Sequence, residues 1–237
     1  EVGRLVQTVR DLGLAENTWI IFTSDNGPWI KFANHGGSAL PLRDGKSTTF
    51  EGGQRVPCIM WAPGRIPAGS SSDTLVSTID LLPSLATLAD SKLPENGNRI
   101  DGLDVSPTIT GDAPSPRDEF IYYSAQGEVD GIRQGDWKLL LRKPQPLLFN
   151  LKEDISEKND LAGANPEKVA ALKARMKELD AEITVNARPV WSHLQTLARL
   201  SGCDLAAAAD DMDAIAQRLG TTVDAQPGTT ALSTSVM

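Results

Sequence analysis

An acid and an amide follow directly after an apolar run in the stretch IIFTSDNGP, residues 20–28. The Asp25 carboxylate and the Asn26 amide oxygen are hard ligands, which suit Ca²⁺ or Mg²⁺ better than soft metals. Gly27 and Pro28 would let the chain turn away without blocking such a site. The alternative is an ordinary turn in which both side chains bond their own backbone. The four residues 25–28 alone favour the turn.

A lysine between small residues stands in the next segment, GGSALPLRDGKSTTFEGGQRVP, residues 36–57. Lys46, flanked by Gly45 and Ser47, could point into a cleft as a compact cation for an anion. A solvated surface charge is the alternative, since lysine is seldom buried. Glu51 and Arg55 are expected to hold the Glu-Gly-Gly turn together by mutual hydrogen bonding.

Composition narrows the classes of partner. The chain has 237 residues and a net charge of −8, from 31 acids against 23 bases. This excess of acid argues against a nucleic-acid or anionic-membrane binder, because such partners need a basic face. No apolar run reaches the length of a membrane-spanning helix. The two cysteines, Cys58 and Cys203, allow at most one disulfide and leave the compartment undecided.

The elements around Asp25 and Lys46 predict an α/β domain. A helical pattern over residues 2–12 is followed by a continuous apolar strand at 18–23, which indicates a buried, parallel sheet. Residues 24–55 form a long irregular loop, and a second buried strand is expected at 57–61. A helix is expected at about 78–89, with Ser77 and Asp80 as a capping box.

A small antiparallel sheet is expected next, because short strands at 120–123, 131–133, 137–141 and 147–151 alternate with polar turns. Asn165-Pro166 starts a helix predicted to run to about 182, with one apolar stripe facing that sheet. Residues 192–219 could form Ala/Leu helices. Residues 220–237 are rich in Thr, Ser and Gly, which predicts disorder.

A family resemblance emerges when these segments are taken in order. SDNGP (24–28) and PLRDGKSTTFEGGQRVP (41–57) resemble the C-terminal half of type I sulfatases, in the alkaline phosphatase superfamily. The similarity continues through WAPGRIPAG (61–69), STIDLLPSLATLA (77–89), IDGLDVSPTITGDAPSPRDEFIYY (100–123), GDWKLLL (135–141) and LFNLKEDISEKNDLA (148–162). Each motif is modest alone, and together they cover about residues 1–187.

The resemblance implies a fold, a cofactor and a site. The fold is a partial alkaline-phosphatase-like sheet-and-helix domain at 1–115, then a small antiparallel α+β subdomain at 116–187 and an unassigned tail at 188–237. Asp25 and Asn26 would be ligands of one divalent cation, with Ca²⁺ favoured over Mg²⁺. Lys46 would touch a sulfate oxygen. His35 lies in a segment near the family's site, or is a satisfied loop histidine.

One part of the family's chemistry is missing from this sequence. The family's nucleophile is a formylglycine made from Cys or Ser in a C/S-x-P/A-x-R motif, and no cysteine or serine here has that context. The two N-terminal acidic metal ligands are also missing. The expected partner is therefore the N-terminal half of the same protein, and the chain alone is expected to be inactive, to bind Ca²⁺ poorly and to expose apolar strand faces.

Two other functions stay open. A phosphonate or phosphate monoester hydrolase of the same superfamily could share the scaffold. A non-catalytic structural or binding fragment would use the turn at 25–28 only as a turn. The substrate would be an aryl or carbohydrate sulfate ester, with no nucleic acid or membrane partner. By resemblance, the compartment would be periplasmic, secreted or lysosomal.

Overall fold

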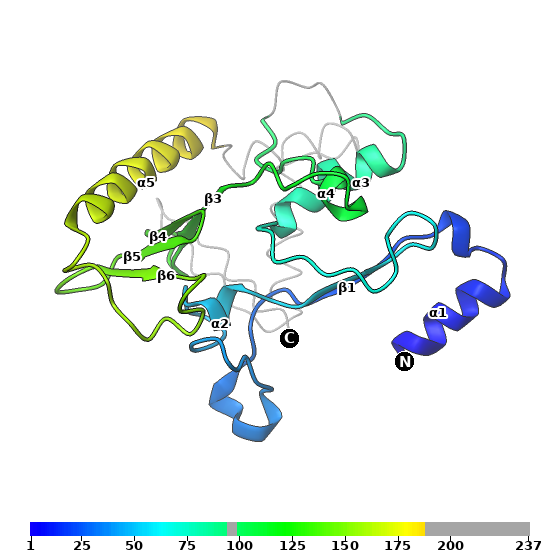
Figure 1. Cartoon of the computed structure of the whole chain (residues 1–237), viewed down its shortest axis with the longest axis horizontal. Coiled ribbons are helices and arrows are strands. Elements are labelled where there is room, and N and C mark those ends of the chain that lie inside the picture. Colours follow the sequence, from blue (N-terminus) through cyan, green and yellow to red (C-terminus); the bar gives the residue numbers. More distant parts are fainter. Residues whose placement is uncertain (94–98, 188–237) are drawn as a thin grey trace, which may run out of the picture. The chain divides into compact units, whose positions relative to one another are not determined.

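Helices and two antiparallel sheets make up residues 1–93 and 99–187, the part of the chain that this computed structural model describes (Figure 1). The elements up to Val185 form one compact unit. The N-terminal elements are α1 (Val2–Asp11), η1 (Ala15–Asn17), β1 (Ile20–Thr23), η2 (Ile30–His35), α2 (Glu51–Gln54), β2 (Cys58–Trp61), η3 (Thr78–Asp80), α3 (Leu81–Leu88) and α4 (Ser106–Thr110). They are followed by β3 (Glu119–Tyr123), β4 (Val129–Gln134), β5 (Trp137–Leu140), β6 (Leu147–Asn150) and α5 (Pro166–Asn186).

Strands β1 and β2 form where they are predicted, but they run antiparallel, with Ile20 opposite Trp61 and Thr23 opposite Cys58. The prediction of parallel strands is therefore wrong for this pair. The apolar run only indicates that a strand is suited to burial. Strand direction depends on the loop 24–57, which leaves β1 and enters β2 at the same end of the sheet.

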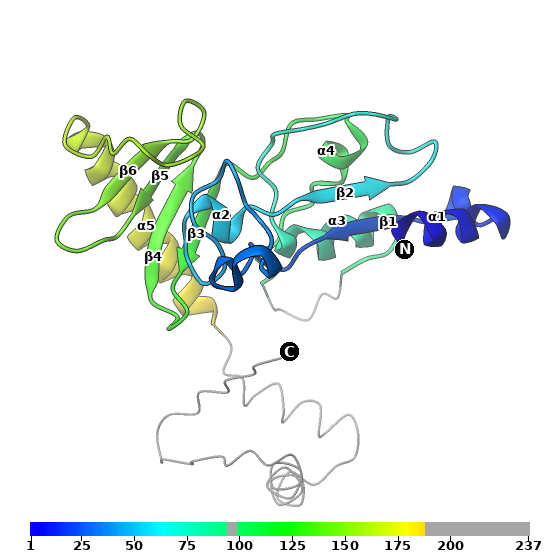
Figure 2. The same cartoon turned by 90° about the horizontal axis from the view of Figure 1, so that it is seen from below.

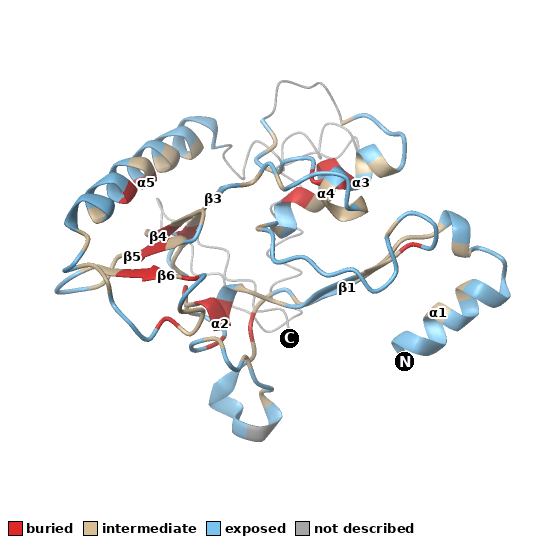
Figure 3. Cartoon of the chain, in the orientation of Figure 1, coloured by how far each residue is buried: buried red, intermediate tan, exposed pale blue. Residues whose placement is uncertain are grey.

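The predicted burial of these strands is also wrong within the described unit. Phe22 in β1 is 49% exposed, and Ile59 in β2 is 63% exposed. Helix α1 has no buried residue, and Leu5 on it is 54% exposed (Figure 3). Apolar side chains on both strands and on α1 are thus exposed to solvent. This agrees with the expectation that the chain alone exposes apolar strand faces.

The small antiparallel sheet is confirmed, with strand order β3-β4-β5-β6. Helix α5 runs four residues beyond the predicted end at about 182. Leu172 and Met176 on this helix pack in one cluster with Ile132, Leu139 and Leu148 of the sheet. Figure 2 shows α5 lying along the sheet. The predicted apolar stripe on the helix therefore covers one face of the sheet.

The loop before α2 covers other apolar residues of the sheet. Phe50 packs against a second cluster that contains Leu140, Phe149 and Leu151. Neighbouring residues of β5 alternate between the two faces of a strand, so Leu139 meets the α5 cluster while Leu140 meets the Phe50 cluster. The sheet thus joins α5 to the loop that carries Lys46.

The predicted helix at 78–89 forms as η3 followed by α3, and the capping box of Ser77 and Asp80 is present. Both Asp80 carboxylate oxygens also accept bonds from the Arg117 guanidinium, at 2.7 and 2.5 Å. Burial would raise the pKa of Asp80, but hydrogen bonds from Arg117, Leu103 and Ser77 outweigh it and lower that pKa. Asp80 is therefore structural.

Several expectations concern residues outside the described part. The tail predictions for 192–219 and 220–237 and the unassigned segment 188–237 fall there, and so does Cys203. Cys58 is an exposed free thiol. None of the helices within residues 1–93 and 99–187 has the length and hydropathy that crossing a bilayer requires.

Candidate functional site

Asp25 and Asn26 lie immediately beyond β1, in a turn that α2 holds from one side. The Gly27 amide donates to the Gly53 carbonyl at 3.0 Å. A Cβ on Gly27 would lie 1.7 Å from the Gly52 carbonyl oxygen, so no other residue fits there without moving α2. The close approach of these two backbones fixes the direction in which residues 25 and 26 leave the strand.

The turn at 25–28 is not built from its own Asx bonds. Its internal side-chain bond is donated by Ser24, whose Oγ reaches the Asn26 carbonyl at 2.8 Å. The Gly27 amide, which an Asp25 turn would use, is taken by Gly53. Within the described residues, neither the Asp25 carboxylate nor the side-chain amide of Asn26 makes a hydrogen bond. Both groups are free to bind something else.

These two groups fit part of a hard-metal site. One carboxylate and one amide oxygen match the ligand chemistry of Ca²⁺, which takes six to eight oxygens. Among residues 1–93 and 99–187, no cluster of three or more His, Cys, Asp or Glu could hold a metal. Asp25 and Asn26 could therefore supply two oxygens of a coordination shell, and further ligands would have to come from elsewhere.

Lys46 is fixed to the same turn through its backbone. Its amide donates to the Pro28 carbonyl at 2.9 Å. Gly45 allows this approach, because a Cβ there would lie 2.4 Å from that carbonyl oxygen. Asp44 and Ser47 on either side have φ angles of 62° and 71°, so the segment is tightly wound. The Lys46 side chain itself is exposed.

Asp25, Asn26 and Lys46 line one cavity of about 640 Å³, together with Trp29 and Arg55. Its size falls within the roughly 300–1,000 Å³ of ordinary ligand pockets. The Lys46 ammonium lies 5.5 Å from the centre of the Trp29 ring. Lys46 and the residues after β1 thus share one open space, which apolar packing does not fill.

His35 lies at the exposed end of η2, and it is not among the residues that line this cavity. Ala33, two residues earlier, has a φ of 48°, which interrupts the helical turn. Asp25, Asn26 and Lys46 therefore line one cavity, and His35 is not part of that lining.

A buried ion cluster anchors α2 to the small sheet and to the loop that follows it. The Lys138 ammonium lies 2.8 Å from Glu51 and 2.9 Å from Glu157, and all three side chains are at most 2% exposed. A Glu157 oxygen also accepts the Glu51 amide at 2.6 Å. Burial raises the pKa of Glu157, while the nearby Lys138 charge works against that rise.

The expected mutual hydrogen bonding of the Glu51 and Arg55 side chains is wrong, because the Glu51 carboxylate pairs with Lys138 in this cluster. Only their backbones bond, at 2.7 Å from the Arg55 amide to the Glu51 carbonyl. The Arg55 guanidinium instead approaches Asp73 at 3.4 Å. Sequence analysis missed Lys138, although a lysine inside the buried strand WKLL is itself a signal that a carboxylate must lie nearby.

Comparisons with known proteins match this chain to one family. The family model described as Sulfatase matches residues 1–91. Human arylsulfatase A is 38% identical over 217 residues, which cover 77% of this chain and 42% of that protein. The chain belongs to the sulfatase family. It spans less than half the length of the curated relatives it matches, in a C-terminal-like portion.

Other sulfatases support the same assignment. Dog N-acetylgalactosamine-6-sulfatase is 46% identical over 122 residues, covering 51% of this chain and 23% of the dog protein. The solved PsFucS1 sulfatase from Pseudoalteromonas sp. superposes with a TM-score of 0.69 at 29% identity. That match covers 77% of this chain and 40% of the solved one. The mixed α/β fold is therefore that of part of a sulfatase.

Proposed function

We propose that this chain supplies the C-terminal portion of a metal-dependent sulfatase that hydrolyses sulfate monoesters. The observation that carries the proposal is the cavity shared by Asp25, Asn26 and Lys46. Family membership supports it, since the matched relatives include arylsulfatase A and N-acetylgalactosamine-6-sulfatase. The formylglycine nucleophile would come from a portion of the protein outside this sequence.

Asp25 and Asn26 would each give one oxygen to a Ca²⁺ ion. Bound there, the ion would polarise a sulfate oxygen as a Lewis acid. The turn that carries both residues is pinned to α2, so their oxygens keep a constant direction. The Lys46 ammonium would neutralise charge that gathers on the sulfuryl oxygens during transfer. Because its backbone is bonded to Pro28, it would keep its place relative to the metal ligands.

The rest of the protein would cover the open apolar faces. Phe22, Ile59 and Leu5 are 49%, 63% and 54% exposed, and they lie on β1, β2 and α1. Continuous apolar strands are typical of sheets buried on both faces. An N-terminal half of the domain packed on these elements would bury them and would bring the missing metal ligands to Asp25 and Asn26.

Two assays test this function. The isolated chain, given 4-nitrophenyl sulfate and Ca²⁺, should show no turnover above background, and clear turnover would contradict the proposal. A protein that joins this chain to a formylglycine-bearing segment should turn over the ester. There, Lys46→Ala should lower kcat by about 10²-fold, the usual effect of losing one oxyanion contact. Lys31→Ala, which removes another exposed lysine of the same loop, is the matched control.

The metal ligands need their own test. In the same joined protein, Asp25→Ala should weaken Ca²⁺ binding, measured by calorimetric titration. Asp73→Ala removes a fully exposed carboxylate and should leave binding unchanged. Equal affinity in the wild type and in Asp25→Ala would favour the simple-turn interpretation of residues 25–28.

A further inference from the structure

An aromatic ring stands beside the sulfate-binding lysine without a role so far. Trp29 follows the Asp-Asn-Gly-Pro turn, lines the same cavity as Lys46 and is 48% exposed. A large exposed aromatic group at a cavity is unusual, because burying it would ordinarily be favourable. Phe22 and Phe32 are exposed as well, but of these three rings Trp29 is the one that lines the cavity containing Lys46, so a ligand held there would cover part of its ring.

The backbone of Trp29 is held rigidly on both sides. Its carbonyl accepts the Phe32 amide at 3.0 Å, and Gly36 approaches so closely that a Cβ there would lie 2.0 Å from the same oxygen. The Pro28 carbonyl just before it accepts the amides of both Ile30 and Lys46. An aromatic side chain on a fixed backbone loses little conformational entropy when a ligand binds.

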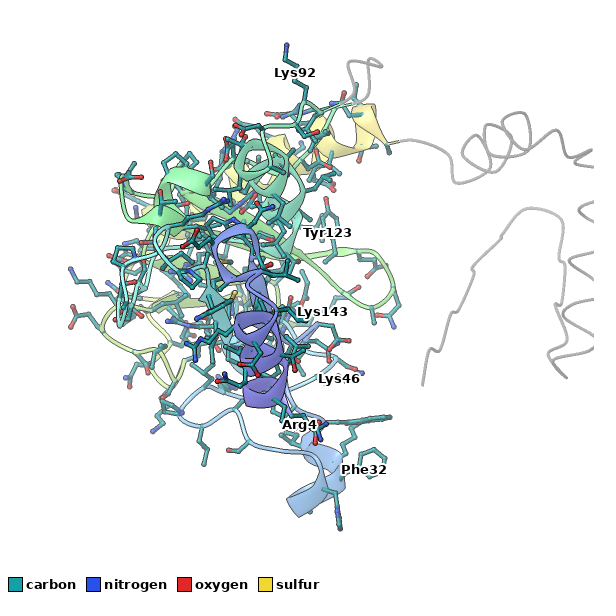
Figure 4. All side chains as sticks on the ribbon, turned by 90° about the vertical axis from the view of Figure 1, so that its right-hand side faces the viewer. Arg4, Phe32, Lys46, Lys92, Tyr123 and Lys143 are labelled. Atoms are coloured by element: carbon teal, nitrogen blue, oxygen red, sulfur yellow. The ribbon has the colours of Figure 1, made fainter. Side chains whose placement is uncertain are left out.

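Phe32 braces the Trp29 ring from one side. The two ring centroids are 4.7 Å apart and the planes meet at 89°, an edge-to-face contact. Such pairs are favoured by the aromatic quadrupole. Phe32 is itself 55% exposed, and Figure 4 shows its ring standing away from the ribbon. The pair forms a small aromatic platform, defined here as Trp29 and Phe32.

We propose that the Trp29 ring of this platform, braced by Phe32, stacks against the sugar ring of a carbohydrate sulfate whose sulfate group meets Lys46. A pyranose has an apolar face of C–H groups and a rim of hydroxyls. The cavity offers the matching set: an aromatic ring, an ammonium 5.5 Å from its centre, and polar groups on Ser24, Ser38 and Asn26. A closed apolar pocket would bind an aryl sulfate better than one exposed aromatic ring does. This inference rests on the proposed function, and it names the substrate class.

A binding experiment on the full 237-residue chain tests the platform. The chain is labelled with 5-fluorotryptophan, and ¹⁹F NMR follows titrations with N-acetylgalactosamine 6-sulfate, inorganic sulfate and 4-nitrophenyl sulfate. The Trp29 signal, assigned from Trp29→Phe, should shift with the sugar sulfate. Trp29→Ala should weaken sugar sulfate binding about five- to tenfold, from the apolar area no longer covered. It should change inorganic sulfate binding less than twofold.

The controls separate this inference from the proposed function. Phe22→Ala removes another half-exposed aromatic side chain, which does not line this cavity, and should leave sugar sulfate binding unchanged. Trp29→Phe should retain part of the affinity, because a ring remains. The platform is overturned if the Trp29 signal does not move, or if the aryl sulfate loses as much affinity as the sugar sulfate in Trp29→Ala. If Lys46→Ala leaves inorganic sulfate binding intact, the sulfate site itself fails instead.

Discussion

Replacing Lys138 by methionine should destabilise the chain strongly while leaving the packed volume nearly unchanged. The Lys138 ammonium is 0% exposed and lies 2.8 and 2.9 Å from two buried carboxylates. Without it, Glu51 and Glu157 would face each other with neither solvent nor a cation between them. Removing one partner of a buried ion pair costs about 3–5 kcal/mol, and the burial of all three side chains places the expected loss within that range.

Urea denaturation followed by circular dichroism measures this loss. The free energy of unfolding of Lys138→Met should fall by about 3–5 kcal/mol relative to the wild type. Lys173→Met, which removes an exposed lysine of α5, should change it by less than about 0.5 kcal/mol. Adding Glu157→Gln to Lys138→Met should recover part of the loss, since one buried charge is then removed. A loss below about 1 kcal/mol in Lys138→Met would refute the reasoning.

Three further predictions concern pH, solubility and the turn. Hydrogen bonds from Arg175 lower the pKa of Glu119 below its ordinary value of 4.5. The pair therefore stabilises the folded chain at pH values above 4.5, and this stability is lost as the pH falls through the lowered pKa. Glu119→Gln should therefore flatten the dependence of unfolding free energy on pH in acid, and an unchanged slope in denaturation series would contradict this. Ile59→Lys should reduce aggregation of the isolated chain, measured by light scattering, because it places a charge on an open strand face. Gly27→Ala should displace α2, since the new Cβ would overlap the Gly52 carbonyl, and it should abolish the binding of inorganic sulfate, measured by NMR titration. An affinity equal to that of the wild type would contradict the close approach of the two backbones.

The small sheet was predictable because its signals are local. Short apolar strands, polar turns and the stripe on α5 each come from neighbouring residues, and together they define strands β3 to β6. The direction of β1 relative to β2 was not predictable in this way. It depends on where a long irregular loop returns the chain, and no local pattern encodes that.

The sequence predicts residue types for the candidate site, but it does not predict their geometry. The motif order placed Asp25, Asn26 and Lys46 in one family site. Their shared cavity depends on glycine contacts and on the Pro28 carbonyl, which only coordinates reveal. Lys138 was missed for the same reason, since its partners Glu51 and Glu157 are far from it in sequence.

The most direct test of the account is a crystal structure of the protein that joins this chain to a formylglycine-bearing segment, grown with Ca²⁺ and sulfate. The account predicts oxygens of Asp25 and Asn26 at about 2.3–2.6 Å from the ion. It also predicts the Lys46 ammonium within hydrogen-bond reach, about 2.7–3.2 Å, of a sulfate oxygen. A calcium ion bound by other residues, or a Lys46 side chain turned into solvent away from the sulfate, would contradict it.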